Sequence, residues 1–154
     1  MTVIERKTIA VSGGFDPIHK GHIRMILDAA SIGDVVIILN SDDWLERKKG
    51  YKFMSWDERS EILRSIRGVI NVYNVDDRDN TVCEALKHLK EDIDLDCFAN
   101  GGDRKETNTP EMKLCQELGI ELLWNVGGGK AQSSSSLIGN IRWGKKIVVG
   151  DIKI

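Results

Sequence analysis

The sequence predicts one α/β domain over residues 1–154, a Rossmann-like, doubly wound sheet of five parallel strands. Five apolar, β-type segments alternate with amphipathic, helix-type segments, which is the pattern of successive right-handed crossovers. Each β-type segment is apolar nearly throughout, as expected of strands that helices cover on both faces. At 154 residues, the chain is large enough to form one core of its own.

The predicted strands cover residues 8–12, 34–40, 69–75, 95–100 and 120–126, and the predicted helices cover 21–32, 56–67, 81–91 and 109–118. Ser55 and Glu58 form a capping box that opens the second helix. Either Asp79 or Asn80 is expected to cap the third helix. Thr109 is followed by Pro110, which is favoured in the first turn of a helix.

The composition excludes several classes of protein. A net charge of −2 provides no general basic field for nucleic acid, and no apolar run approaches the roughly 20 residues that span a bilayer. The first residues contain no signal-peptide core, and three widely spaced cysteines fit neither a zinc site nor a disulfide framework. We therefore expect a cytoplasmic protein with no nucleic-acid or membrane partner. The acidic cluster at residues 76–79 matches no known metal loop, so no protein-bound metal is predicted.

The functional hypothesis centres on residues 13–22, between the first strand and the first helix. Gly13 and Gly14 allow the backbone to approach a ligand, and Asp16-Pro17 is typical of an N-cap and first helical residue. His19 and His22 are spaced to project from one helix face, where they would add donors to the positive end of a helix dipole. This arrangement suits phosphate. The alternative is a plain Gly-Gly turn with surface histidines.

The sequence from His19 to His22 resembles the His-x-Gly-His signature of the nucleotidyltransferase superfamily that includes the cytidylyltransferases, and residues 13–18 resemble its Gly-Thr-Phe-Asp lead-in. Members transfer a nucleoside monophosphate from CTP or ATP to a phosphate-bearing acceptor. The resemblance implies that His19 and His22 hold phosphates and stabilise the transition state. It also implies nucleotide contacts from Gly14, Phe15 and Asp16, the first two through backbone N–H groups.

A basic segment at residues 47–52 follows the second predicted strand, and we interpret it as a loop. Such a cluster is often a solvated surface patch, but its position resembles the mobile lysine loop of the family. Lys48 is the best match to the catalytic lysine, ahead of Arg47 and Lys49. Arg59 resembles a family arginine that faces the site, and it is a candidate phosphate or substrate contact; the alternative is a surface helix position.

A Gly-Gly-Asp segment follows the fourth predicted strand. It resembles the family's Gly-Asp motif, in the form found in the branch that activates heptose. The resemblance implies that Gly102, Asp103 and Arg104 lie near the nucleoside. A common Gly-Gly-Asp turn is the alternative.

A Gly/Ser-rich tract follows the last predicted strand and could be a linker. It resembles the family's Ile-Ser-Ser/Thr-Thr motif, with Ser134, Ser135 and Ser136 in register as phosphate contacts. Ser133 replaces the isoleucine, and the arginine that often precedes the motif is absent unless Lys130 substitutes for it. Residues 144–154 contain a further apolar run that could pair with a sheet edge or a second subunit, and we expect a homodimer.

The expected activity is transfer of CMP from CTP to a small phosphate- or phosphonate-bearing substrate, with release of pyrophosphate. A phosphate monoester is already nucleophilic at neutral pH, so catalysis reduces to positioning and charge stabilisation. Mg²⁺ is expected as a cofactor bound mainly through the triphosphate. Two alternatives stay open: an adenylyltransferase that uses ATP on a sugar phosphate, and a nucleotide-binding regulatory module without turnover.

Overall fold

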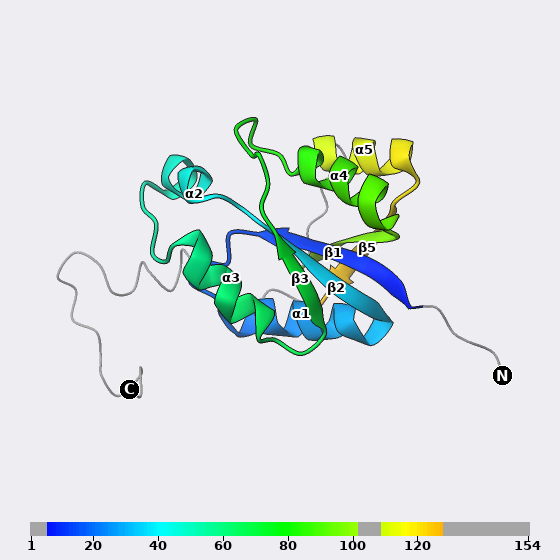
Figure 1. Cartoon of the computed structure of the whole chain (residues 1–154), viewed down its shortest axis with the longest axis horizontal. Helices are drawn as coiled ribbons and strands as arrows, with labels where there is room; N and C mark the ends of the chain where they lie inside the picture. The colour runs from blue at the N-terminus through cyan, green and yellow to red at the C-terminus, as the bar shows by residue number, and fades with distance from the viewer. Residues whose placement is uncertain (1–5, 102–108, 128–154) are drawn as a thin grey trace.

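The computed structural model describes residues 6–101 and 109–127 of the chain. Its sheet contains five parallel strands in the order β3-β2-β1-β4-β5 (Figure 1). The strands are β1 (Lys7–Gly13), β2 (Gly33–Leu39), β3 (Val69–Tyr73), β4 (Cys97–Gly101) and β5 (Glu121–Val126). The strand order reverses between β1 and β4, which is where a doubly wound sheet opens a ligand crevice at its carboxyl edge. The predicted fold class is confirmed.

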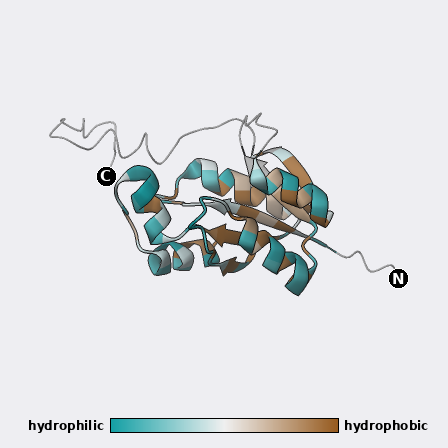
Figure 2. Ribbon diagram, turned by 90° about the horizontal axis from the view of Figure 1, so that it is seen from above, coloured by the Kyte–Doolittle hydropathy of each residue, from teal (hydrophilic) through white to brown (hydrophobic). Residues whose placement is uncertain are grey.

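Helices cover both faces of the sheet (Figures 1 and 2). On one face, α1 (Lys20–Ile32) and α3 (Trp56–Arg64) contribute Ile26, Ala29 and Leu63 to a buried core with β1 and β2. On the other face, α4 (Cys83–Ile93) and α5 (Pro110–Leu118) form a second core around Leu86 and Cys115. Figure 2 shows hydrophobic strands between helices whose outer surfaces are hydrophilic. No helix among the described residues is long and apolar enough to cross a membrane.

The structure contains a further short helix, α2 (Asp42–Lys49), where the sequence analysis expected a basic loop. Ser41 caps it by accepting a hydrogen bond from the backbone N–H of Trp44, and Gly50 ends it in the left-handed conformation with φ 81°. Acidic residues occupy its first turn and basic residues its last, which matches the helix dipole. The loop prediction was therefore wrong, and the basic residues lie on a helix beyond the carboxyl end of β2.

Two local predictions also need correction. Val82 is the N-cap residue of α4 and makes no side-chain capping bond, while Asp79 accepts instead from the N–H and hydroxyl of Thr81. The expectation that every strand is covered on both faces fails at β3, an edge strand whose register with β2 shifts near Ile70, which is 58% exposed. The predicted N-cap at Ser55 is confirmed, because its side chain accepts from the backbone N–H of Glu58. Thr109 caps α5 in the same way, by accepting from the backbone N–H of Met112.

Candidate nucleotide site at the ends of β1 and β2

The histidine pair stands at the start of α1. Helix α1 begins at Lys20 with His19 as its N-cap, so the prediction that Asp16 and Pro17 open the helix was wrong. Nδ1 of His19 accepts a hydrogen bond of 3.1 Å from the backbone N–H of Gly21. Nδ1 of His22 accepts one of 3.1 Å from the backbone N–H of His19. The two side chains thus form a reciprocal capping box that satisfies N–H groups left unpaired at a helix start.

The two imidazole rings lie together rather than apart. Their centroids are 3.8 Å apart and their planes 23° from parallel. The ring of Phe15 packs against His22 at 4.8 Å, and Phe15 is itself only 3% exposed. A cluster of three rings, two of them stacked and the third tilted, therefore stands at the carboxyl end of β1, at the point where the strand order reverses.

Asp16 connects the β1–α1 junction to the segment between α2 and α3. Its side chain is fully buried, and its two carboxylate oxygens each accept a hydrogen bond of 2.7 Å, from the backbone N–H groups of Phe53 and Met54. This is why Asp16 does not cap α1: its carboxylate is turned toward a different segment. Asp16 thus supports the β1–α1 junction through the segment after α2, and the nucleotide contact implied by the family resemblance stays a prediction.

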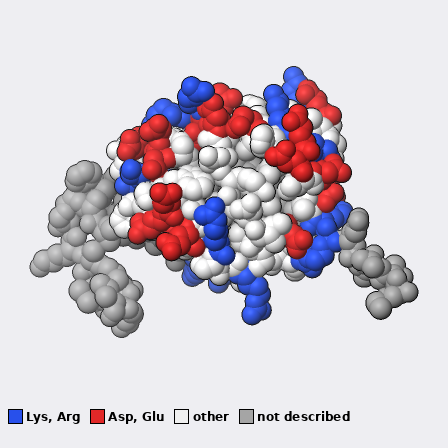
Figure 3. Space-filling view, in the orientation of Figure 1, with Lys and Arg blue, Asp and Glu red and all other residues white. Residues whose placement is uncertain are grey.

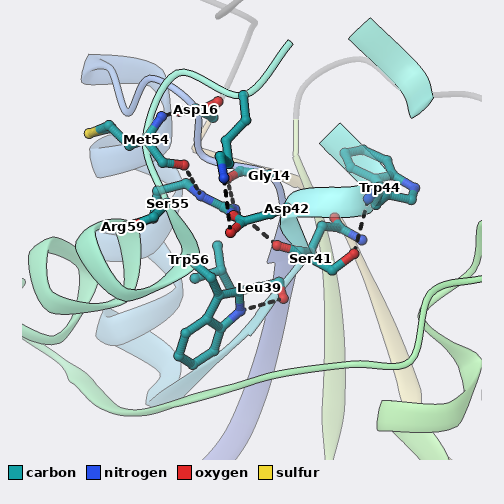
Figure 4. A network of polar contacts seen from close by, with 12 residues as sticks. Gly14, Asp16, Leu39, Ser41, Asp42, Trp44, Met54, Ser55, Trp56 and Arg59 are labelled. Carbon is teal, nitrogen blue, oxygen red and sulfur yellow. Dashed lines mark hydrogen bonds and ion pairs between the residues drawn. The ribbon is translucent and has the colours of Figure 1, made fainter. Parts of the chain in front are cut away.

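Arg59 holds together the carboxyl ends of the two central strands (Figure 4). Its guanidinium donates to the carbonyl oxygens of Gly14 at 2.8 Å, Asn40 at 2.9 Å and Met54 at 3.0 Å. It also forms an ion pair of 2.7 Å with Asp42 in the first turn of α2. The Arg59 side chain is 0% exposed, so the alternative of a surface helix position is wrong, and the guanidinium supports the ends of these strands from beneath.

A second buried acid, Asp77, anchors the other side of α2. Asp77 is 2% exposed and accepts hydrogen bonds from Nδ2 of Asn40 and from both the N–H and the hydroxyl of Ser41. Its carbonyl oxygen accepts from Arg47 at 2.8 Å. Sequence reasoning treated Asp77 as one acid of a solvated loop. The signal that was available is the polar pair Asn40-Ser41 directly after a buried strand.

The three basic residues at the end of α2 point in different directions. Nζ of Lys49 lies 3.3 Å from the carbonyl oxygen of Asp16, in the β1–α1 junction, and burial lowers the pKa of Lys49. Nζ of Lys48 lies over the ring of Trp44 at 4.7 Å, and Arg47 is bound to Asp77. The described contacts therefore place Lys49 at the β1–α1 junction and Lys48 against Trp44.

Position 14 has no room for a side chain, because helix α2 packs against it. A Cβ at Gly14 would lie 2.8 Å from Cδ2 of Leu45 and 3.3 Å from the ring of Trp44. Leu45 is fully buried, so this contact fixes the distance between α2 and the end of β1. Close packing of α2 accounts for the glycine at this position; the predicted approach of the protein backbone to a ligand is not needed to explain it.

Several predicted site residues lie outside the described residues. They are Gly102, Asp103, Arg104, Lys130, Ser134, Ser135 and Ser136, together with the segment 144–154. Within the part of the chain that the structure describes, no group of three or more His, Cys, Asp or Glu side chains is arranged to hold a metal ion.

The sheet order, the crevice at the strand reversal and the imidazole pair on a helix N-terminus define a nucleotide-binding domain of the α/β class. Comparison with known families agrees, because the cytidylyltransferase-like family matches residues 10–125. The chain belongs to this family, which lies within the nucleotidyltransferase superfamily.

Similar proteins carry several names. The FAD synthase of Methanobrevibacter smithii is 26% identical over 96% of this chain and 94% of its own length. The bifunctional protein HldE of Desulfatibacillum aliphaticivorans is 27% identical over 91% of this chain, which spans only 28% of that larger protein. A solved structure from Vibrio parahaemolyticus, described as a nicotinate-nucleotide adenylyltransferase, superposes with a TM-score of 0.61 at 17% identity. It covers 93% of this chain and 91% of its own, and it supports the fold.

Proposed function

We propose that this chain is a nucleotidyltransferase that transfers a nucleoside monophosphate from a nucleoside triphosphate to a small phosphate-bearing acceptor. The observation that carries the proposal is the stacked pair His19 and His22 at the N-terminus of α1, at the strand reversal. Imidazole donors combined with the positive end of a helix dipole form a site for anionic oxygens.

The proposed reaction is an in-line displacement at the α-phosphorus. A phosphate oxygen of the acceptor attacks, the bond to the bridging oxygen of the β-phosphate breaks, and pyrophosphate leaves. His19 and His22 stabilise the charge that develops on the phosphate oxygens in the transition state. No covalent intermediate is required, so positioning and electrostatics supply the rate enhancement.

Lys49 is the best-placed lysine for the triphosphate, since its ammonium group already lies at the β1–α1 junction. The sequence resemblance favours Lys48, whose ammonium group lies over the ring of Trp44. We propose Lys49 as the principal phosphate contact and Lys48 as a secondary one. Mg²⁺, bound mainly through the triphosphate, would neutralise part of the phosphate charge.

The choice between ATP and CTP now favours ATP. FAD contains an adenylyl group, so the name FAD synthase, carried by a relative that matches 96% of this chain, favours an adenylyl donor. The name of the matching family, cytidylyltransferase-like, keeps CTP as a candidate. We therefore place transfer of AMP first, to a phosphorylated acceptor such as a sugar phosphate or a flavin phosphate, and transfer of CMP second.

A matrix assay tests the proposal. The full chain is incubated with Mg²⁺, each of ATP, CTP, GTP and UTP, and each of a panel of acceptors: flavin mononucleotide, sugar phosphates, glycerol phosphate and a phosphonate. Release of pyrophosphate is measured together with the mass of the product. His22→Ala should lower turnover roughly a hundredfold or more, by analogy with loss of one preorganised donor. His88→Ala serves as the matched control, because His88 lies on the exposed face of α4 and should leave turnover unchanged.

Each outcome discriminates. Pyrophosphate release with one pair of substrates supports the proposal and identifies both of them. Nucleotide binding without release under every pairing would contradict it and favour a regulatory nucleotide-binding module. Near-normal turnover in His22→Ala would contradict the proposal that the histidine pair stabilises the transition state.

A further inference from the structure

Helix α2 depends on its side-chain contacts for its position. It has 8 residues and one buried side chain, Leu45, and an isolated helix of that length is marginal in water. At its start, the hydroxyl of Ser41 donates to Asp77 at 2.6 Å, and Asp42 pairs with Arg59 at 2.7 Å. These contacts hold the first turn. The last turn, which carries the basic residues, needs anchors of its own.

Two basic side chains of this last turn reach in different directions. Arg47 donates to the carbonyl oxygen of Asp77 at 2.8 Å and to Oδ1 of Asn80 at 3.3 Å, in the segment between β3 and α4. Nζ of Lys49 lies 3.3 Å from the carbonyl oxygen of Asp16, at the β1–α1 junction. Residues two apart on a helix do not face each other. The last turn of α2 is therefore held on two sides, by the end of β3 and by the end of β1.

The partner of Arg47 is a preformed turn. The N–H of Asn80 donates to the carbonyl oxygen of Asp77 at 2.9 Å, and Asn80 adopts the left-handed conformation with φ 64°, which asparagine tolerates better than most residues. The carboxylate of Asp77 is bound to Asn40 and Ser41, and Asp77 is 2% exposed. The turn is thus fixed to the carboxyl end of β2, and it presents two oxygen atoms to Arg47.

We propose that Arg47 is a positioning residue: its bonds to the turn at residues 77–80 set the last turn of α2, and the last turn holds the ammonium group of Lys49 at the β1–α1 junction. That Lys49 meets a triphosphate at this junction rests on the proposed function. Arg47 then acts through Lys49, and not through a phosphate contact of its own.

Placement of single cations matters because the molecule has no general basic field. The net charge is −2, and on the face shown in Figure 3 the Lys and Arg side chains are interspersed with Asp and Glu. A lysine on an unanchored segment must be ordered when an anion binds, and this ordering weakens binding. Loss of the Arg47 anchor should therefore weaken triphosphate binding although Lys49 keeps its charge.

A double-mutant cycle tests whether Arg47 acts through Lys49. The full chain, Arg47→Met, Lys49→Met and the double variant are titrated with ATP and with inorganic tripolyphosphate by calorimetry. Lys49→Met should weaken binding about tenfold or more, and Arg47→Met roughly threefold to tenfold. In the Lys49→Met chain, Arg47→Met should have no further effect. Additive losses would show that Arg47 contacts the anion itself and would overturn the proposal.

Arg78→Met is the matched control. Arg78 belongs to the same turn, but its guanidinium pairs with Asp76 and its side chain is 86% exposed. Its loss removes the same charge without touching α2 and should change the affinity less than about twofold. Asn80→Gly tests the anchor from the other side, because glycine keeps the left-handed backbone and removes only one acceptor of Arg47. It should weaken binding in the same direction as Arg47→Met, and unchanged affinity would count against the anchor.

The alkaline limit of tripolyphosphate binding separates positioning from a general loss of stability. Burial lowers the pKa of Lys49, Lys48 and Arg59 lower it further, and Asp16 acts in the opposite direction. If Arg47→Met releases Lys49 from its half-buried place, this pKa should rise, and the remaining binding should persist to higher pH. An unchanged alkaline limit would overturn the positioning role, because Lys49 would then have kept its place.

Amide hydrogen exchange of the full chain without ligand tests the anchor independently of any activity. Arg47→Met should speed exchange in the last turn of α2, where the N–H of Gly50 bonds to the carbonyl oxygen of Glu46 at 2.9 Å, and leave β1 and β2 at wild-type rates. Unchanged exchange in α2, or equal loss of protection throughout the sheet, would overturn the proposal. If the wild-type chain shows no turnover with any substrate pair, the proposed function fails, and the tripolyphosphate titration and the exchange rates still decide the role of Arg47.

Discussion

Replacing Arg59 by Met should destabilise the protein strongly, because the Arg59 guanidinium is buried and bound to three carbonyl oxygens and one carboxylate. Met has a similar length and fills the space, so the change removes donors without opening a large cavity. It leaves the carbonyl oxygens of Gly14, Asn40 and Met54 without the donor that Arg59 supplies, and Asp42 without the arginine of its ion pair.

The magnitude follows from these contacts. A buried acceptor that loses its partner costs about 1–3 kcal/mol, and breaking a buried ion pair by removing one member costs about 3–5 kcal/mol. Asp42 is 32% exposed and keeps a second cation, Lys52, at 3.6 Å, so water and Lys52 offset part of the loss. We expect Arg59→Met to lower the free energy of unfolding by about 3–5 kcal/mol and Arg59→Lys by about half of that.

Urea denaturation followed by circular dichroism measures the free energy of unfolding. An unchanged dependence of this free energy on urea concentration would show that only stability has changed. Arg67→Met is the matched control, because Arg67 is exposed after the end of α3, and its loss should stay within about 0.5 kcal/mol. If Arg59→Met cost less than about 1 kcal/mol, the ends of β1 and β2 would be held by something other than this guanidinium.

Three further predictions follow from packing and ionisation. Gly14→Ala should lower the free energy of unfolding by about 1–3 kcal/mol, because the new Cβ would collide with Leu45. In a double-mutant cycle with Leu45→Ala the two losses of stability should be non-additive, and additive losses would contradict the contact. Burial lowers the pKa of Lys49, so this ammonium group loses its charge at a lower pH than an ordinary lysine does. Lys49→Arg should therefore extend nucleotide binding to higher pH, because arginine keeps its charge there. The KM for the triphosphate measured against pH checks this, and an unchanged profile would exclude Lys49 from the phosphate site. Cys115 should resist alkylation by iodoacetamide at about pH 8, because burial raises its pKa to about 12 and keeps it a thiol. The partly exposed Cys83 should be alkylated first, and mass spectrometry of digested samples would show the order.

Local patterns in the sequence predicted most of the fold. Alternation of apolar strands with amphipathic helices is a short-range signal, and it correctly placed all five strands and four of the helices. Helix α2 was not predicted, because it has only 8 residues and a single buried one, Leu45, and so shows no apolar periodicity. Its end signals, Ser41 and Gly50, were present but were read as parts of a loop.

The support beneath the site could not be predicted, because its partners are far apart in the chain. Arg59 reaches Gly14 across 45 residues, and Asp77 reaches Asn40 across 37. No spacing rule indicates such contacts, since a charged residue in a helix or a loop is usually solvated. The histidine pair was predictable for the opposite reason: both partners lie within one helical turn.

The bonds from Asp16 to the chain after α2 end on main-chain N–H groups, and this has a consequence for evolution of the site. Any residue except proline supplies such a group, so positions 53 and 54 can change their side chains while the frame around the histidines stays intact. Phe53 is already 55% exposed at this place. Relatives with the same chemistry can therefore differ in the surface that residues 53 and 54 present, without any change in the β1–α1 junction that carries the histidines.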